Sequence, residues 1–396
     1  MKFRGLAAAG CAVALAVTGV SGASAAPGGT DQTPPKVRFA TYNVAFDKST
    51  SAGELIDVLQ AGSADARSIA EVIQINRPDV LLVNEIDWDA AGEAADIFQE
   101  DYLEVGQNNQ KPITYPYRYL DTVNTGVLSG SDLNHDGTIA LPDDGHGFGL
   151  FEGQYGMLVL SMYPIDTAAV RTFQNFLWTD MPGNLLPYDW FDNPPVGPPA
   201  SPTLRLSSKS HWDLPILIGD ETVHLLASHP TPPAFDDNQA DRNKRHNYDE
   251  IRFWSDYMKS GSDAAYIYDD NGVHGGLPQG AKFVMVGDQN TDPNDGDGLP
   301  GAIAQVLDLP MVTDPLPSSR GGVVNDRSPE HITDPKYDTS FFSSFNLRVD
   351  YVLPGNLKVG NSKVYWPAAG PGADLVTASD HRLVWADVFP GQKVNK

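Results

Sequence analysis

The chain has 396 residues, of which 41% are hydrophobic, and its 51 acidic residues outnumber 27 basic ones to give a formal net charge of −24. Such a charge repels DNA and anionic membranes, so it disfavours nucleic acid as a partner and favours a small substrate, although acidity also serves solubility alone. Cys11 is the only cysteine, which excludes an intramolecular disulfide and zinc–thiolate sites.

The first residues have the pattern of an export signal. Lys2 and Arg4 precede a mostly apolar run at 6–20, and three small residues follow at 23–25. This order of basic, apolar and small residues is typical of a secretory signal peptide. We therefore predict a signal peptide at 1–25 and a secreted protein.

Two other interpretations of this segment are less favoured. Gly10-Cys11 resembles a lipoprotein processing site, but most of the apolar stretch follows Cys11 instead of preceding it. The stretch is also too short and too rich in alanine and glycine for a membrane span. We expect a flexible lead-in at 26–35, a single folded domain at 36–392, no stable membrane insertion and a monomeric protein.

The chain then alternates between strand and helix patterns. Residues 37–44 read as a strand, residues 65–76 as a helix that Arg77-Pro78 ends, and residues 80–83 as a second strand. The second strand is continuously apolar, which suits a sheet that is covered on both faces. This rhythm is typical of layered α/β enzymes.

The same rhythm returns in the second half of the chain. A helix is predicted at 245–257 from the spacing of its apolar residues. Strands are predicted at 156–161, 215–218, 223–227, 283–286, 347–353 and 383–388, of which the second and third form a hairpin. Residues 104–150 and 178–210 do not fit, and long loops of this kind usually serve a binding site.

Polar side chains follow several of the predicted strands. The four motifs are Thr41-Tyr42-Asn43, Val83-Asn84-Glu85, Gly287-Asp288-Gln289-Asn290 and Ser379-Asp380-His381. Oxygen ligands of this kind bind hard cations such as Mg²⁺. Because phosphoester cleavage needs a cation to offset charge on the phosphoryl oxygens, the set indicates metal-assisted phosphoester hydrolysis.

In this order, the four motifs resemble those of the endonuclease/exonuclease/phosphatase superfamily, and the resemblance covers about residues 37–390. It implies an α+β fold, a four-layer α/β/β/α sandwich with two packed mixed β-sheets. Asn84 departs from the family pattern, which usually has glutamine before the glutamate. That change shortens one side chain near the cation without removing Glu85.

The resemblance also implies roles for individual residues. Asn43, Glu85 and Asp380 correspond to cation ligands, with Mg²⁺ the expected ion and Mn²⁺ or Ca²⁺ as alternatives. The corresponding catalytic residues are His229, Asp288, Asn290, Asp350 and His381.

These residue types support an in-line attack by water on phosphorus. Asp350 would orient the imidazole of His381, and Asp288 or His381 would accept the proton of the water. His229 and Asn290 would hydrogen-bond the equatorial oxygens of the substrate. Tyr155, in a Gly-rich turn, either reaches the phosphate or is an ordinary tyrosine at the edge of the core.

Three further segments carry charge. Asp132, Asn134 and Asp136 have the spacing of a calcium loop without helical flanks, so they predict either a structural Ca²⁺ site or a polar turn. The acidic segment 292–297 predicts either another cation loop or a solvated turn, and the turn is favoured. Lys209 lies in a basic segment that we expect to pair with surface carboxylates, with a phosphate contact as the alternative, and the same holds for the basic segment 241–245.

The leading functional hypothesis is a secreted phosphatase or phosphodiesterase that acts on small phosphorylated substrates. The alternatives are a secreted nuclease, disfavoured by the net charge, and a phospholipid head-group phosphodiesterase. The latter would need an exposed apolar hairpin, for which Trp190-Phe191 and Phe341-Phe342 are candidates. A further alternative is a calcium-ordered binding protein on an inactive phosphoesterase scaffold.

Overall fold

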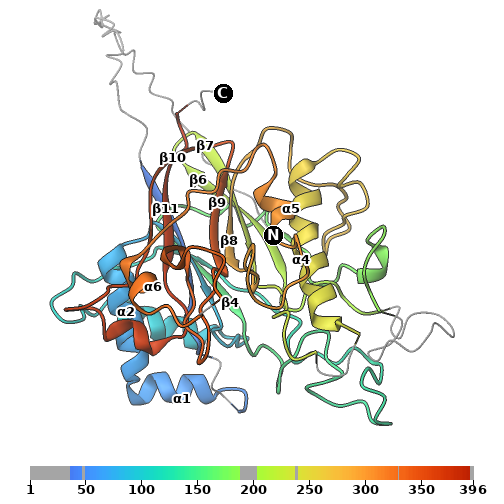
Figure 1. Cartoon of the computed structure of the whole chain (residues 1–396), viewed down its shortest axis with the longest axis horizontal. Coiled ribbons are helices and arrows are strands. Elements are labelled where there is room, and N and C mark those ends of the chain that lie inside the picture. The colour runs from blue at the N-terminus through green and yellow to red at the C-terminus, as the bar shows by residue number, and fades with distance from the viewer. Residues whose placement is uncertain (1–35, 47–49, 188–202, 237–239, 329, 393–396) are drawn as a thin grey trace, which may run out of the picture. The chain divides into compact units, whose positions relative to one another are not determined.

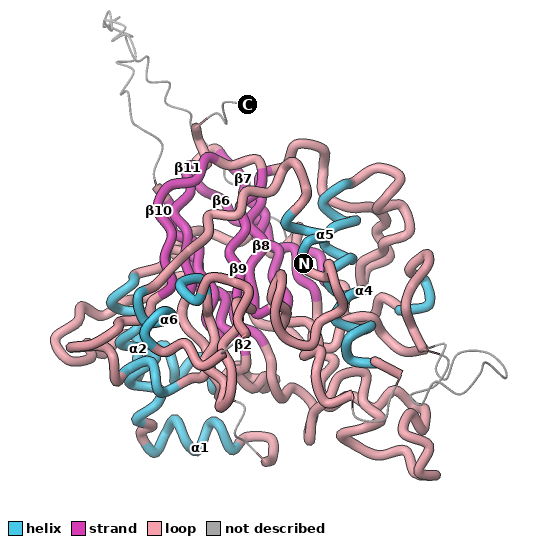
Figure 2. The backbone as a smooth tube through the Cα atoms, in the orientation of Figure 1, coloured by secondary structure: helices cyan, strands magenta, loops and turns pink. Residues whose placement is uncertain are grey.

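Two mixed β-sheets pack face to face between helices in the computed structural model (Figures 1 and 2). The structure describes residues 36–392 except for 47–49, 188–202, 237–239 and 329. The predicted signal peptide and lead-in therefore lie outside the described residues. Within this part, the predicted layered α+β sandwich is confirmed.

The first sheet has six strands in the order β10-β11-β1-β2-β4-β3. Its central strands β1 and β2 run parallel, and β11 and β4 flank them in antiparallel orientation. The strands are β1 (Val37–Asn43), β2 (Val80–Asn84), β3 (Tyr117–Tyr119), β4 (Met157–Ser161), β10 (Lys358–Val364) and β11 (Val384–Phe389).

The second sheet has five strands in the order β5-β6-β7-β8-β9 and repeats this arrangement. Its parallel pair is β7 and β8, flanked by antiparallel β6 and β9. The strands are β5 (Arg171–Thr172), β6 (His211–Ile218), β7 (Glu221–Ser228), β8 (Lys282–Asp288) and β9 (Asp350–Gly355).

Alternating side chains of β8 show why this sheet needs cover on both faces. Val284 and Val286 belong to the core between the sheets, whereas Phe283 and Met285 belong to a second core beneath the helix α4 (Arg242–Lys259). Successive side chains of a strand point to opposite faces, so a strand buried on both sides must be apolar throughout. The strand predicted at 283–286 is confirmed, and its continuous apolar run fits this layering.

Helices cover the outer faces of both sheets. The helix α2 (Ala64–Asn76) buries Ile69, Val72 and Ile73 in the core of the first sheet, and α4 covers the second sheet with Ile251 and Trp254. The other helices are α1 (Glu54–Ala61), α3 (Glu93–Ile97), α5 (Ala304–Leu307) and α6 (Arg320–Val324), and the short helical turns are η1 (Phe98–Leu103), η2 (Trp178–Asp180), η3 (Pro335–Tyr337) and η4 (Leu375–Ala378). None of the helices in the described part of the chain has the length and apolarity needed to cross a membrane.

Candidate active site

Three of the four polar motifs meet because they lie at the ends of parallel strands, whereas the motif at 379–381 follows η4 and precedes β11. In the first sheet Asn43 pairs with Asn84 in register, so Glu85 follows at the same edge. In the second sheet His229 follows β7 and Asp288 ends the parallel strand β8. The carboxyl ends of parallel strands share one edge of a sheet, which places these side chains together.

Asn43 joins the two carboxylates across the sheets. Its Nδ2 donates to Oε1 of Glu85 at 2.8 Å and to Oδ2 of Asp288 at 3.1 Å. Its Oδ1 accepts from the backbone N–H of Ala45 at 3.1 Å. Asn43 therefore holds the carboxylates as a hydrogen-bond donor, and its role as a cation ligand stays a prediction.

His381 is oriented by a buried carboxylate. Its Nδ1 lies 2.9 Å from Oδ2 of Asp350, which pairs with Asp288 at the start of β9. Its Nε2 consequently faces the site, 3.6 Å from Oδ2 of Asp288. The ring of Phe342 packs edge-on against this imidazole, with centroids 5.5 Å apart.

The second imidazole, His229, faces the same carboxylates. Its Nε2 lies 3.5 Å from Oδ2 of Asp288 and 3.8 Å from Oε1 of Glu85. Asn290 positions this corner, because its backbone N–H donates to Oδ1 of Asp288 and its side chain donates to the carbonyl of Pro230. We refer to Asn43, Glu85, His229, Asp288, Asp350 and His381 as the strand-end cluster.

Burial and neighbouring charges give these groups different proton affinities. Burial raises the pKa of Asp288 to about 6, against the opposing effect of His381. Burial alone would lower the pKa of His381, but the carboxylates of Asp350 and Asp288 outweigh it and hold that pKa well above its usual range. Burial, with Lys209 and His381 nearby, keeps the pKa of His229 well below its usual range.

The donor set fits a divalent cation. Ligand atoms of Glu85, His229 and Asp288 all lie within 4.8 Å of one another. Carboxylate oxygens suit Mg²⁺ and Mn²⁺, and the imidazole suits first-row transition ions.

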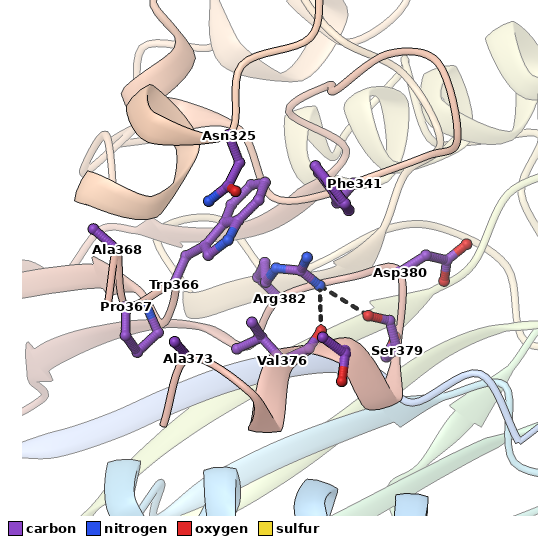
Figure 3. A pocket seen from close by; sticks show the side chains of 11 residues that line it. Asn325, Phe341, Trp366, Pro367, Ala368, Ala373, Val376, Ser379, Asp380 and Arg382 are labelled. Carbon is purple, nitrogen blue, oxygen red and sulfur yellow. Dashed lines mark hydrogen bonds between the residues drawn. The ribbon is translucent and has the colours of Figure 1, made fainter. Parts of the chain in front are cut away.

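Other predicted site residues lie outside this cluster. Asp380 is exposed, and Figure 3 shows its carboxylate pointing away from Arg382 in a pocket of about 340 Å³. Trp366 and Phe341 line the same pocket. Tyr155 is half-buried and has a left-handed backbone conformation (φ 57°). Its turn lies beside the loop that follows Glu85, because the backbone N–H of Trp88 donates to the carbonyl of Gly153. Their predicted roles stay predictions.

The predicted calcium loop forms a polar turn. Asp132 accepts the backbone N–H groups of Asp136 and Gly137, and Asn134 also accepts from Asp136. These oxygens already stabilise the turn without an ion, and Asp136 and Gly137 are exposed. The structural calcium site stays a prediction.

Sequence reasoning placed Lys209 wrongly at the surface. Lys209 is only 6% exposed, and burial lowers its pKa although Glu250, Glu85 and Asp288 oppose that shift. Burial arises because Glu250 of α4 accepts the backbone N–H groups of Ser208 at 2.7 Å and Thr231 at 2.6 Å, folding this segment against the site. The surface pairing is confirmed in the other basic segment, where Lys244 lies 3.1 Å from Asp241.

Glu250 was missed altogether by sequence reasoning. A signal was present, because polar Asn247 and Glu250 alternate with the apolar residues of α4 at helical spacing and both are buried. Asn247 donates to the carbonyls of Thr231 and Gln289 at 2.9 Å. Buried polar side chains on a helix indicate contacts of this kind.

Only one of the two apolar hairpin candidates lies in the described part of the chain. Trp190-Phe191 lies outside the described residues. Phe341 and Phe342 are half-buried, and Phe341 packs edge-on against Trp366 with Arg327 stacked 3.8 Å from its ring centre. These contacts hold Phe341 within the protein and not as part of a free apolar tip.

The chain is similar to one protein family and to several solved structures. The model of the Endonuclease/Exonuclease/phosphatase family matches residues 40–381. An endonuclease/exonuclease/phosphatase from Beutenbergia cavernae is similar at 16% identity and a TM-score of 0.49, over 90% of this chain and 72% of that one. Sphingomyelinase C from Streptomyces griseocarneus is similar at 17% identity and a TM-score of 0.43, over 89% of this chain and 99% of that one. No curated protein matches the sequence.

Proposed function

Because the chain belongs to the endonuclease/exonuclease/phosphatase family of metal-dependent phosphoester hydrolases, we propose that it is an exported phosphatase or phosphodiesterase of small organophosphates. One observation carries the proposal: Glu85 of the first sheet, Asp288 of the second sheet and two imidazoles converge at one end of the sandwich. The pattern of the first 25 residues supports export.

Glu85 would be the principal ligand of the cation, with His229 and Asp288 within reach. A divalent cation bound there offsets charge on the phosphoryl oxygens and on the leaving oxygen. Asn43 holds the Glu85 and Asp288 carboxylates at fixed separation, so the protein fixes this geometry before substrate arrives.

Asp288 is the group best placed to accept the proton of the attacking water. Asn290 engages its Oδ1, so Oδ2 faces the site between the two imidazoles. His381 is committed to Asp350 through Nδ1, which leaves Nε2–H to donate to a phosphoryl or leaving oxygen. The geometry therefore favours Asp288 over His381 as the base.

Two features support a small substrate over a polymer. The net charge of −24 repels nucleic acid. The pocket beside Asp380, with a volume of about 340 Å³, has aromatic walls and the Arg382 guanidinium, and this volume matches the lower range of small-molecule sites. We propose that the organic part of the substrate enters this pocket.

The test is hydrolysis of a phosphomonoester, a phosphodiester, plasmid DNA and a choline phospholipid, with chelator or with added Mg²⁺, Mn²⁺ or Ca²⁺. We expect metal-dependent release from a small ester, abolished by Asp288→Asn and retained in Asp220→Asn, a matched change in the exposed turn between β6 and β7. Activity that survives both chelation and Asp288→Asn would refute the mechanism. Preferential cleavage of plasmid or phospholipid would replace the proposed substrate class.

A further inference from the structure

A second group of carboxylates surrounds an imidazole outside the strand-end cluster. Asp292 and Asp295 follow β8, and His331 and Asp338 flank the helical turn η3. Nε2 of His331 lies 3.3 Å from Oδ1 of Asp338 and 3.5 Å from Oδ2 of Asp295. We call Asp292, Asp295, His331 and Asp338 the loop cluster.

Burial of this cluster corrects the expectation of a solvated turn at 292–297. Asp292 is only 7% exposed because its oxygens accept backbone and side-chain donors, among them the Arg348 N–H at 2.8 Å and the Thr333 hydroxyl at 2.7 Å. Asp295 accepts the N–H of Thr333 at 2.8 Å. The acidic loop is thereby folded inward against the segment that carries His331.

Asp338 is a buried carboxylate of the loop cluster that lacks regular hydrogen bonds within the described part of the chain. Its side chain is fully buried, and neither carboxylate oxygen accepts a hydrogen bond of regular geometry from the described residues. Burial, together with the carboxylates of Asp292 and Asp326, raises its pKa to about 8. A buried carboxylate of this kind is costly unless a cation or donor compensates for it.

The imidazole is oriented as in metal sites. Nδ1 of His331 lies 3.3 Å from Oδ1 of Asp326, while Nε2 faces the other carboxylates and has no hydrogen-bond partner among the described residues. A carboxylate on one ring nitrogen fixes the tautomer that presents the other nitrogen to an ion.

We propose that Asp292, His331 and Asp338, with Asp295 beside them, bind a divalent first-row transition ion, and that Zn²⁺ fits best. Ligand atoms of the first three residues lie within 4.8 Å of one another. Four ligands about 2 Å from Zn²⁺ in a tetrahedron stand about 3.3 Å apart, close to the separations found around His331. One imidazole among carboxylates favours such an ion over Ca²⁺, which takes six to eight oxygens.

The ion would tie together two segments that support the active site. Asp292 lies two residues after Asn290, and Thr339 follows Asp338. The Thr339 hydroxyl accepts the backbone N–H groups of Val349 at 3.0 Å and Asp350 at 2.9 Å. Binding would therefore stabilise the wall behind His381, whether or not the proposed substrate is correct.

The test is metal content after equilibration with Zn²⁺ and removal of free ion, in wild type, His331→Gln, Asp338→Asn and Asp288→Asn. We expect His331→Gln and Asp338→Asn each to lose one bound equivalent that Asp288→Asn retains. The matched control is His224→Gln, which alters a histidine paired with Asp213 on the neighbouring strand and should keep the ion. Equal Zn²⁺ content in wild type and both loop-cluster variants would overturn the proposal.

A second measurement does not depend on how well these variants fold. In Asp288→Asn, chelation should lower the unfolding temperature by about 5 °C, and Zn²⁺ should restore it. Co²⁺ added to the same variant should give the visible absorption of a tetrahedral site with imidazole ligation. If chelation leaves the unfolding temperature unchanged and Co²⁺ gives no such absorption, the loop cluster is a metal-free imidazolium–carboxylate group.

Discussion

The strand-end cluster and the loop cluster use the same side-chain types but satisfy them differently. In the strand-end cluster, Asn43 donates to both Glu85 and Asp288. In the loop cluster, Asp338 accepts no regular hydrogen bond from the described residues. The first is therefore held in shape by the protein itself, whereas we infer that the second depends on an ion. We expect damage to the first to reduce turnover and damage to the second to reduce stability.

The largest effect is predicted for Asp288→Asn. Loss of the general base and of one carboxylate beside the cation should lower kcat/KM about 10⁴-fold, or about 5.5 kcal/mol. Thermal unfolding should be unchanged or slightly delayed, because burial raises the pKa of Asp288 and so disfavours its charge. Steady-state kinetics and calorimetry check both expectations. A large drop in unfolding temperature with activity retained would reverse the comparison.

An imidazole outside both clusters provides the pH prediction. Burial lowers the pKa of His211 to about 4, and its Nε2–H donates to the backbone carbonyl of Glu250 at 2.9 Å. The unfolded chain binds a proton below about pH 6.5 and the folded chain only near pH 4. Stability should therefore fall by about 3 kcal/mol as the pH drops through this window.

Urea unfolding at pH 7, 5 and 4 measures this loss. His211→Gln should reduce the slope of stability against pH without abolishing it, because burial also lowers the pKa of His146 to about 4. An unchanged slope would show that the acid sensitivity arises elsewhere, with the two clusters as the next groups to test.

Asp350→Asn tests how much the Asp350 carboxylate contributes to turnover through His381. Without its charge, Asp350 no longer stabilises the protonated imidazole of His381, so kcat should fall about 100-fold while KM changes little. The matched control is Asp213→Asn, which alters an aspartate paired with His224 at 2.7 Å and should leave kcat unchanged. A larger effect on KM than on kcat would make His381 a binding group instead.

The smallest effect is predicted for Thr339→Val, which lies between the clusters. Two buried N–H groups would lose their acceptor, so the free energy of unfolding should fall by about 2 kcal/mol, with a few-fold loss of kcat through Asp350. Thr339→Ser keeps the hydroxyl and should retain most of both quantities in urea unfolding and kinetics. Equal losses in the two variants would attribute the effect to packing.

The sequence predicted the strands that carry the strand-end cluster because those strands are continuously apolar and end in polar residues. The runs at 80–83 and 283–286 became β2 and β8. It missed β10, whose residues Lys358–Val364 alternate polar and small side chains at a largely exposed sheet edge. It also missed α1, a helix whose glycine caps at 53 and 62 give no side-chain cap signal.

Residues whose environment is set by distant partners could not be predicted. Lys209 looked like a surface residue because nothing in its own segment shows that Glu250, 41 residues later, folds it inward. The acidic turn at 292–297 looked solvated because the segment that carries His331 and Asp338 lies far along the chain. Local patterns give strands and their ends, whereas burial of charge depends on tertiary contacts.

The hydrogen bond from Asn43 to Asp288 crosses the boundary between the sheets, since Asn43 ends a strand of one sheet and Asp288 ends a strand of the other. Hydrogen bonds weaken steeply when their geometry departs from the ideal, so a slide of one layer over the other by about an ångström would break this connection. Turnover should therefore depend on how the two sheets are aligned. Moderate warming should reduce activity at a temperature below that at which the protein unfolds. A variant that stays active at higher temperature would need stronger contacts between the two sheets, in addition to stronger contacts within each sheet.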